Sequence, residues 1–358
     1  SLTFIFSLIV FLSEARSAQP VLQDLFTSGK DDYHTYRIPA IVTTNKGTLL
    51  VFCEGRKNNR NDHGNLDMLL RRSVDGGKTW LPTQLVYDEG GDSEVTIGNA
   101  CPVVDKDTGK IWLPFTRNNE DVLITSSSDD GKTWSKPHHV TDQVKRDGWG
   151  WYATGPGNGI QLTRGSFKGR LVIPCDHRLI RIKDRNRSTR SHVIYSDDHG
   201  KSWKIGGSTD FLMNECTIVE LTNGNLLLNM RSNRGHKMRA VATSVNGGID
   251  WSKCIDDPAL PEPVCQAHML RLNWPADDQP GRLVFSNPAS RTSRENLVVR
   301  VSYDDGKTWP NNRTIYEGSA AYSCMTILAN GNIGIVFERD NYAQISYCEI
   351  SVRWLEDF

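Results

Sequence analysis

Polar and charged side chains stand at the ends of six short apolar segments, each of which begins with Gly and one variable residue. The groups are Glu54 with Arg56, Thr116 to Asn118, Cys175 to His177, Arg231 to Asn233, Ser286 with Asn287, and Glu338 with Arg339. A buried isolated charge costs several kcal/mol, so such a set is tolerated where its members line a shared, wet cavity. Taken singly, each group could equally be a solvated strand end or a surface ion pair.

Two further residues stand out by their setting. Arg37 lies in Tyr-Arg-Ile-Pro, where Pro39 stiffens the chain, biases Ile38 towards an extended conformation and so holds Arg37 in one direction. Tyr322 is surrounded by small residues, which leave its hydroxyl accessible. A lone Tyr is more often a core or rim residue, so this feature alone does not define a site.

Five copies of one turn indicate the architecture that positions these residues. The pattern Ser-x-Asp-x-Gly-x-Thr/Ser-Trp occurs at 73–80, 127–134, 196–203 and 302–309, with a degenerate copy at 244–251. Asp and Gly supply the turn conformation, and Trp packs back on the sheet. In the degenerate copy Asn246 and Asp250 replace Asp and Thr, which should weaken that turn. Self-similarity of this kind marks a repeat protein.

The Gly-led apolar segments give the number of repeats. They begin at Gly47, Gly109, Gly169, Gly224, Gly281 and Gly331, 50 to 62 residues apart. Short strands at such spacing predict an all-β fold, a six-bladed β-propeller of four-stranded antiparallel blades with these segments as its inner strands. The last repeat lacks the turn, so the segment around 21–26 is expected to supply its missing outer strand and close the ring.

The start of the chain is expected to be a leader and not part of the fold. Residues 4–12 are apolar but fall short of the about 20 residues that span a bilayer, and small residues follow at 15 and 17. We therefore expect a signal peptide at 1–18, truncated at its start, and one propeller at 19–358 without a transmembrane segment. The expected location is secreted, with the lysosome as the alternative.

Composition excludes several other functions. Lys plus Arg and Asp plus Glu both number 42, so no global field attracts nucleic acid, and anion recognition must come from a local cluster of arginines. The eight cysteines show no zinc-ligand spacing and are expected to be mostly free and buried, with Cys254 and Cys265 the pair best placed for a bridge. With no metal cluster and no phosphate-binding Gly loop in the sequence, no cofactor or metal is expected.

These motifs carry a resemblance. Tyr-Arg-Ile-Pro at 36–39, the repeated turns and the spaced later arginines resemble the exo-α-sialidases, or neuraminidases, of bacteria and animals, in which such turns are called Asp boxes. The resemblance covers about residues 30–350, although the turns alone also occur in propellers of unrelated function. It implies a retaining exo-α-sialidase that releases terminal sialic acids from glycoproteins, glycolipids and oligosaccharides.

The family holds the carboxylate of sialic acid with three arginines. The matching positions are Arg37, Arg231 and Arg294, and Arg291 is a rival for the third place. Arg294 is preferred because it lies immediately before the next expected strand. The resemblance also implies that Glu338 braces the first arginine, with an ion pair between Glu338 and Arg339 as the competing interpretation.

Sialidases replace the usual carboxylate nucleophile of retaining glycosidases with Tyr. A phenol approaches the anionic sugar uncharged, but with a pKa near 10 it needs a base or a cationic setting. The resemblance implies that Tyr322 is this nucleophile and Glu215 its base, with Glu220 as a solvated decoy. It implies Asp62 as the acid that protonates the leaving oxygen and later activates water, with Asp67 as the alternative.

Further contacts follow from the same resemblance. Arg56 is expected to reach the ring hydroxyls with help from Asn99, and Tyr152, Cys175 and His177 to line the side that receives the acyl and glycerol groups. Core packing is an equal explanation for the two Trp residues of the loop at 148–157. The alternative functions are a trans-sialidase, a non-catalytic sialic-acid-binding propeller and a scaffold propeller.

Overall fold

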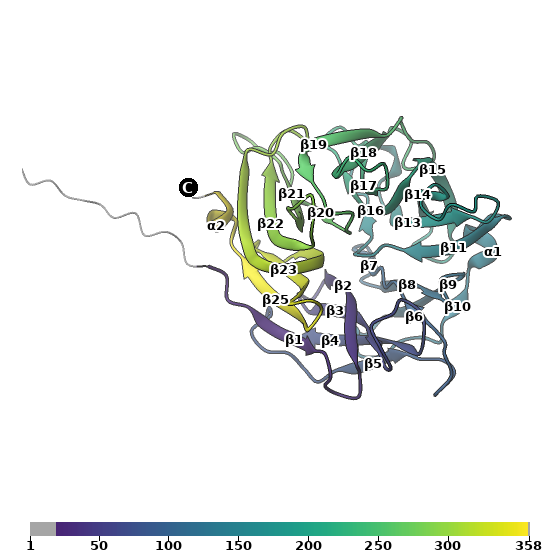
Figure 1. Cartoon of the computed structure of the whole chain (residues 1–358). Coiled ribbons are helices and arrows are strands. Elements are labelled where there is room, and N and C mark those ends of the chain that lie inside the picture. Colours follow the sequence, from purple (N-terminus) through teal and green to yellow (C-terminus); the bar gives the residue numbers. More distant parts are fainter. Residues whose placement is uncertain (1–18, 357–358) are drawn as a thin grey trace, which may run out of the picture.

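The structure, a computed structural model, describes residues 19–356 and shows a ring of antiparallel β-sheets (Figure 1). The predicted leader at 1–18 lies outside the described residues. The first blade contains β2 (Thr35–Thr43), β3 (Leu49–Arg56), β4 (Leu66–Ser73) and β5 (Gln84–Tyr87). The second contains β6 (Ile97–Gly98), β7 (Val103–Val104), β8 (Ile111–Arg117), β9 (Asp121–Ser127) and β10 (His138–His139).

The next two blades repeat the arrangement. The third contains β11 (Trp149–Thr154), β12 (Ile160–Gln161), β13 (Leu171–Leu179), β14 (Thr189–Ser196) and β15 (Lys204–Phe211). The fourth contains β16 (Met213–Glu220), β17 (Leu226–Ser232), β18 (Met238–Ser244) and β19 (Ile255–Pro261). The helices in the described part are short: α1 (Thr141–Val144), α2 (Val352–Glu356) and a 3-10 turn at Gly165–Phe167.

The last two blades share one long strand. The fifth contains β20 (His268–Asn273), β21 (Arg282–Pro288), β22 (Glu295–Ser302) and the first half of β23 (Asn311–Ile327). The second half of β23 pairs with β24 (Ile333–Arg339), which pairs with β25 (Gln344–Ile350). The described strands thus sort into six blades, as predicted.

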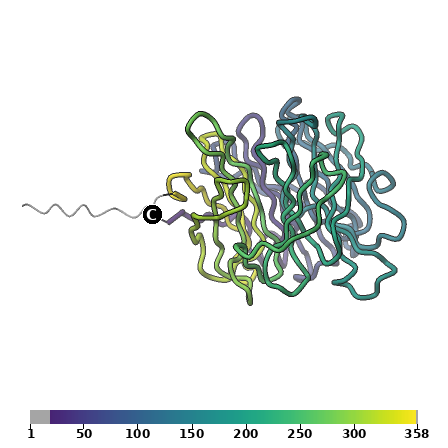
Figure 2. The backbone as a smooth tube through the Cα atoms, turned by 90° about the horizontal axis from the view of Figure 1, so that it is seen from above, coloured from purple at the N-terminus to yellow at the C-terminus, as the bar shows by residue number. Residues whose placement is uncertain are grey.

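The N-terminal strand completes the last blade. β1 (Gln23–Thr27) pairs antiparallel with β25, with Gln23 opposite Tyr347. Turned by 90°, the backbone shows the first and last described segments on the same side of the ring (Figure 2). This pairing confirms the predicted closure of the ring.

The prediction that the Gly-led segments are the innermost strands is wrong. They form β3, β8, β13, β17, β21 and β24, the second strand of each blade. A central cavity is instead lined by β2, β7, β12, β16, β20 and the end of β23. The second strands are covered on both sides and read as continuous apolar runs. Bulges interrupt the innermost strands and weaken their pattern. One lies between Arg37 and Ala40, where Ile38 has a φ of 59°, so the extended conformation expected for Ile38 before Pro39 is wrong.

The cysteines follow the favoured expectation. All eight lie in the described part of the chain as free, buried thiols. Burial raises the pKa of the Cys53 thiol well above its usual value, as expected for a packing residue. The bridge considered between Cys254 and Cys265 is not formed.

The repeated turns share one set of hydrogen bonds. In the first, the Ser73 hydroxyl and the backbone N–H and hydroxyl of Thr79 all donate to the Asp75 carboxylate. In the degenerate copy the Asn246 side-chain oxygen accepts from the Asp250 N–H, and the Asn246 amide donates to the Asp250 carboxylate, both at 2.9 Å. In the ordinary turn the side chain at the seventh position donates to the Asp, whereas here the Asn246 side chain donates to Asp250. The turn therefore keeps this hydrogen bond, and the prediction that it is weakened is wrong.

This exchange makes a prediction about stability. Asn246→Asp alone should lower the free energy of unfolding by about 1 kcal/mol, because two carboxylates would then face each other where a hydrogen bond stood. Adding Asp250→Thr should restore the loss, since the ordinary pair is then rebuilt. Differential scanning calorimetry of both variants tests this. A single variant as stable as the parent, or a double variant no better than the single one, would contradict it.

Candidate active site

The innermost strands carry polar residues to both ends of the central channel. At one end β2, β16 and β23 present Arg37, Glu215 and Tyr322. Glu220 lies five residues beyond Glu215 on β16, about 16 Å along an extended strand. The two ends are therefore separate sites, and only one of them can hold the predicted catalytic set.

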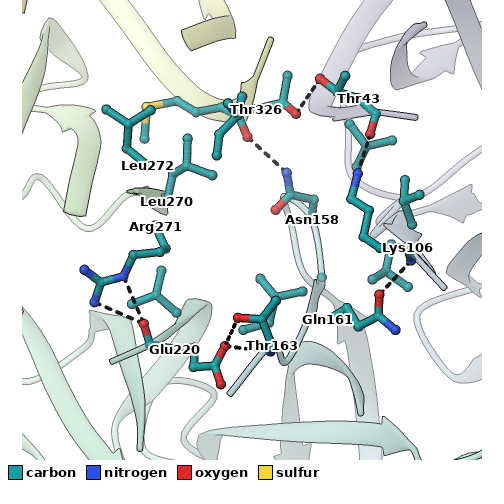
Figure 3. A pocket seen from close by; sticks show the side chains of 18 of the residues that line it. Thr43, Lys106, Asn158, Gln161, Thr163, Glu220, Leu270, Arg271, Leu272 and Thr326 are labelled. Atoms are coloured by element: carbon teal, nitrogen blue, oxygen red, sulfur yellow. Dashed lines mark hydrogen bonds between the residues drawn. The ribbon is translucent and has the colours of Figure 1, made fainter. Parts of the chain in front are cut away.

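The cavity at the Glu220 end has a volume of about 440 Å³ (Figure 3). Glu220 accepts hydrogen bonds from the N–H of Thr163 and of Arg164, each at 2.8 Å. The Lys106 ammonium donates to the Thr43 carbonyl at 3.1 Å. The groups drawn there thus satisfy one another, and Glu220 is too far from Tyr322 to act as its base.

At the other end Tyr322 is bonded to the predicted base. Its hydroxyl donates to one oxygen of Glu215. Arg231 lies 2.7 Å from the other Glu215 oxygen and 3.2 Å from the Tyr322 hydroxyl. Burial raises the pKa of Tyr322 well above its usual value, and the Glu215 charge adds to this, whereas Arg231 and Arg294 oppose it. Tyr322 therefore rests as a neutral phenol with an acceptor for its proton in contact.

All three predicted arginines surround this phenol. The Arg37 and Arg294 guanidinium carbons lie 5.1 and 5.4 Å from the centroid of the Tyr322 ring, and Arg231 contacts its hydroxyl. Arg291, the rival for the third place, is exposed and lies 3.4 Å from backbone carbonyls of a neighbouring loop. Three converging guanidinium groups make this end of the channel suited to a carboxylate.

A single buried carboxylate braces this arrangement. Glu338 accepts from the Arg37 side chain at 2.7 and 3.3 Å, from the Ile38 N–H at 2.8 Å and from the Tyr322 N–H at 3.1 Å. It thereby ties β2 and β23 to its own strand, β24. Arg339 pairs with Asp24 and Asp340 instead, so the competing ion pair is not formed.

Asp62 stands at the open mouth of the site. Its carboxylate lies 2.9 Å from Arg56 and 3.7 Å from Arg37, with its side chain 59% exposed. Partial burial would raise the pKa of Asp62, but Arg56 and Arg37 outweigh it and hold this pKa below its usual value. Asp67, the alternative, is buried and engaged by Tyr33 at 2.7 Å and Lys57 at 3.2 Å.

Arg56 and Asn99 lie behind Asp62. Arg56 donates to Glu54 at 2.6 Å, and the Asn99 N–H donates to the same carboxylate at 2.9 Å. The Asn99 side-chain amide is bonded to Thr116 at 3.0 Å. Arg56 is therefore positioned beside Asp62, whereas the amide of Asn99 already has a partner in the protein.

The structure does not bring Tyr152, Cys175 and His177 to the site. All three are buried, with Tyr152 bonded to His192 at 2.9 Å and His177 stacked on Trp149. The reason is the period of a strand: alternate residues of β13 face opposite sides, and positions 175 and 177 face the core between blades. The residue between them faces the other way.

That residue, Asp176, was predicted only as a member of the strand-end group Cys175 to His177 and was given no role of its own. It is buried, neither carboxylate oxygen has a hydrogen-bond partner among residues 19–356, and it lies within electrostatic range of Glu215 and Arg231. Tyr342 was also missed. The Arg37 guanidinium carbon lies 4.3 Å from its ring centroid, and Arg294 donates to its hydroxyl at 3.0 Å. Tyr342 sits in a loop whose sequence carries no signal of this contact.

Asp176 makes stability depend on pH. Burial, and then the charge of Glu215, raise its pKa from 3.8 to about 7. The folded protein therefore holds a proton that the unfolded chain releases, so this residue lowers stability as pH rises from about 4 to about 7. Asp176→Asn should raise the melting temperature at pH 8 and have little effect at pH 4. Melting curves across this range test it, and a shift of equal size at both ends would contradict it.

Comparison with known proteins identifies the family. Residues 47–335 match the family described as a BNR repeat-like domain. The chain is 33% identical to a sialidase of Micromonospora viridifaciens over 93% of its own length and 54% of that protein. It is 32% identical to an exo-alpha-sialidase of Aspergillus fumigatus, covering 95% of this chain and 89% of the relative. The chain therefore belongs to the exo-α-sialidase family.

Solved structures share the fold. A Hadza microbial sialidase superposes with a TM-score of 0.82 at 30% identity, over 92% of this chain and 68% of that one. A leech intramolecular trans-sialidase gives a TM-score of 0.81 at 16% identity, over 93% and 70%. The chain spans 54% and 61% of two bacterial sialidases that it matches. Within residues 19–356, no helix has the length and apolar character needed to cross a bilayer.

Proposed function

We propose that this protein is a retaining exo-α-sialidase that hydrolyses terminal sialic acids of glycoproteins, glycolipids and oligosaccharides. The observation that carries the proposal is the convergence of Arg37, Arg231 and Arg294 on a phenol whose hydroxyl is bonded to Glu215. Sialic acid presents a carboxylate on the anomeric carbon itself. A site that binds this carboxylate therefore places the anomeric carbon beside Tyr322.

The first step forms a bond between the sugar and the enzyme. The Tyr322 oxygen attacks the anomeric carbon while its proton passes to Glu215. The bond to the leaving oxygen breaks, and Asp62 protonates that oxygen. Asp62 must hold a proton for this step although the guanidinium groups favour its ionised form. A substrate carboxylate partly neutralises Arg37, which raises the pKa of Asp62 towards the acid form.

The second step releases the sugar. Asp62, now ionised, takes a proton from water as the water oxygen attacks the anomeric carbon. The bond to the Tyr322 oxygen breaks, and the proton held by Glu215 returns to the phenol. Two displacements at one carbon restore the original configuration, so the proposal predicts retention.

A fluorogenic sialoside tests the activity, and proton NMR of the first product tests the stereochemistry. We expect turnover with initial release of the α-anomer. Absence of turnover, with sialic acid still bound, would favour the non-catalytic alternative. Initial release of the β-anomer would remove the covalent tyrosyl intermediate while leaving the hydrolase in place.

Transfer to another acceptor uses the same residues. The fold is shared with a leech intramolecular trans-sialidase, and at 16% identity that likeness concerns the fold alone. Product analysis separates the two outcomes: free sialic acid indicates hydrolysis, and an anhydro sugar or a sialylated acceptor indicates transfer. We further propose that the protein is secreted, or lysosomal, which cell fractionation of the full-length chain would test.

A further inference from the structure

A strongly basic hairpin connects β13 to β14. Residues 178–190, here called the basic hairpin, contain six cations and one acid. The cations are Arg178, Arg181, Lys183, Arg185, Arg187 and Arg190, and the acid is Asp184. The whole chain has a formal net charge of zero, so this concentration of one sign is local.

Most of this charge has no carboxylate partner among residues 19–356. Asp184 pairs with Arg187 at 3.5 Å. Arg181, Lys183 and Arg185 are exposed, and within the described part of the chain no carboxylate forms an ion pair with any of them. Unpaired like charges on one short loop repel each other, and an anionic ligand would relieve that repulsion.

The basic hairpin lies on the active-site face of the ring. β3 and β17, the second strands of two other blades, end there with Arg56 and Arg231. β13 is the second strand of its own blade, so the hairpin that follows it emerges on the same face. By contrast, the Asp-containing turns follow the third strands, which run the other way.

A chain of contacts leads from the hairpin to Asp62. The guanidinium carbons of Arg178 and Arg185 lie 4.4 and 5.8 Å from the centroid of one Trp151 ring. The edge of Trp151 meets His63 with ring centroids 5.6 Å apart, and His63 is the neighbour of Asp62 in the chain. Two aromatic rings, those of Trp151 and His63, thus connect these cations to the neighbour of Asp62, the proposed acid.

The electrostatics of Arg178 place it close to the reacting groups. Burial, and then the nearby charge of Arg185, lower the pKa of Arg178 to about 10. The charge of Arg231 also lowers this pKa, whereas those of Asp176 and Glu215 raise it. Its Nε atom is buried and has no hydrogen-bond partner among the described residues. The hairpin therefore continues the positive field of the three arginines outwards from the channel.

We propose that the basic hairpin binds a second negatively charged group of the substrate, on the leaving-group side of the cleaved bond. This proposal rests on the proposed function, because the leaving group begins where Asp62 protonates it. The ligand class is a sialoside whose adjoining sugar carries a carboxylate or a sulfate ester. The protein would then prefer glycans with neighbouring acidic sugars over those with a neutral sugar next to sialic acid.

The test compares substrates that differ in the charge of the leaving group. The variant Arg181→Ser, Lys183→Ser, Arg185→Ser is assayed on an α2,8-linked sialic acid dimer and on sialyllactose, by release of free sialic acid. Lys78→Ser, Lys132→Ser, Lys307→Ser removes the same charge from turns on the opposite face and serves as the matched control. For each substrate, kcat/KM of the variant is divided by kcat/KM of the parent, so that a difference in linkage preference between the two substrates cancels.

We expect kcat/KM on the dimer to fall about 5- to 10-fold at low ionic strength and by less than twofold on sialyllactose. Added salt should shrink the difference, and the control should change neither substrate. An equal fall on both substrates, or none, would overturn the proposal. Sialyllactose sulfated on galactose distinguishes a sulfate ester from a carboxylate as the ligand of the hairpin. If kcat/KM of the triple variant also falls on this substrate, the hairpin binds any anionic group. If kcat/KM falls on the dimer alone, the hairpin binds a carboxylate.

A direct binding measurement keeps this test independent of turnover. If the parent cleaves neither substrate, the proposed function fails and the hairpin is judged by calorimetric titration. The dimer should then bind the parent about fivefold more tightly than the triple variant, and the sialic acid monomer equally to both. Equal affinities for the dimer would overturn the inference.

Discussion

Tyr322→Phe should lower kcat/KM on a fluorogenic sialoside by on the order of 10²- to 10⁴-fold, because it removes the atom that we propose attacks the sugar. The change should leave folding intact. The hydroxyl contacts Glu215 and Arg231, which remain bonded to each other at 2.7 Å after it is removed. The loss should therefore fall on kcat, with substrate binding through the arginines retained.

The stereochemistry of any residual turnover sharpens this prediction. Without the phenolic oxygen, water must attack the anomeric carbon directly, and a single displacement releases the opposite anomer. Tyr303→Phe is the matched control, since it also deletes one phenolic hydroxyl, here bonded to Glu356 at 2.8 Å and far from the site. Full activity of the Tyr322 variant, or equal losses in both, would remove Tyr322 as the nucleophile.

Arg37→Lys should lower kcat/KM on the order of 100-fold while keeping the charge. A lysine ammonium lacks the planar fork with which Arg37 bonds Glu338 and, in the proposed function, binds the substrate carboxylate. We expect KM to rise and kcat to fall together, because Glu338 also holds the backbone N–H of Tyr322. Steady-state kinetics on a sialoside measure both, and Arg291→Lys, an exposed arginine, should leave them unchanged.

A companion variant separates binding from folding. Arg37→Lys weakens the support of a buried carboxylate and should lower the melting temperature. Arg294 has no carboxylate within ion-pair distance among the described residues and bonds the Tyr342 hydroxyl and the Val264 carbonyl. Arg294→Lys should therefore reduce kcat/KM with an unchanged melting temperature. Normal kinetics in both variants would mean that the arginines do not bind the substrate.

The repeats predicted the fold well because they are local signals. Asp and Gly define each turn through bonds between residues at most four apart, such as those of Asp75 with Ser73 and Thr79. The covered second strands are short apolar runs that can be counted from the sequence. The innermost strands were misplaced because bulges and polar residues interrupt their pattern, and such features depend on contacts across the channel.

Only those residues of the site that belong to a sequence motif or stand at the end of an apolar segment could be predicted. Arg37, Glu215 and Tyr322 lie together, as expected from residues that are far apart in the chain. Tyr152, Cys175 and His177 were misassigned because one residue of register decides which face of β13 a side chain joins. Asp176 was given no role and Tyr342 was missed, because their importance comes from their surroundings: burial beside Glu215 for Asp176, and the guanidinium groups of Arg37 and Arg294 for Tyr342.

The pairing of β1 with β25 joins residues more than 300 positions apart, such as Gln23 and Tyr347. In a chain made from its N-terminus on the ribosome, this contact cannot form until β25 has been synthesised. Contacts of such long sequence separation slow folding, and edges left unpaired in the meantime invite aggregation. The final blade, which carries Tyr322 and Glu338, is thus the last to assemble, so activity should emerge only after the ring is sealed.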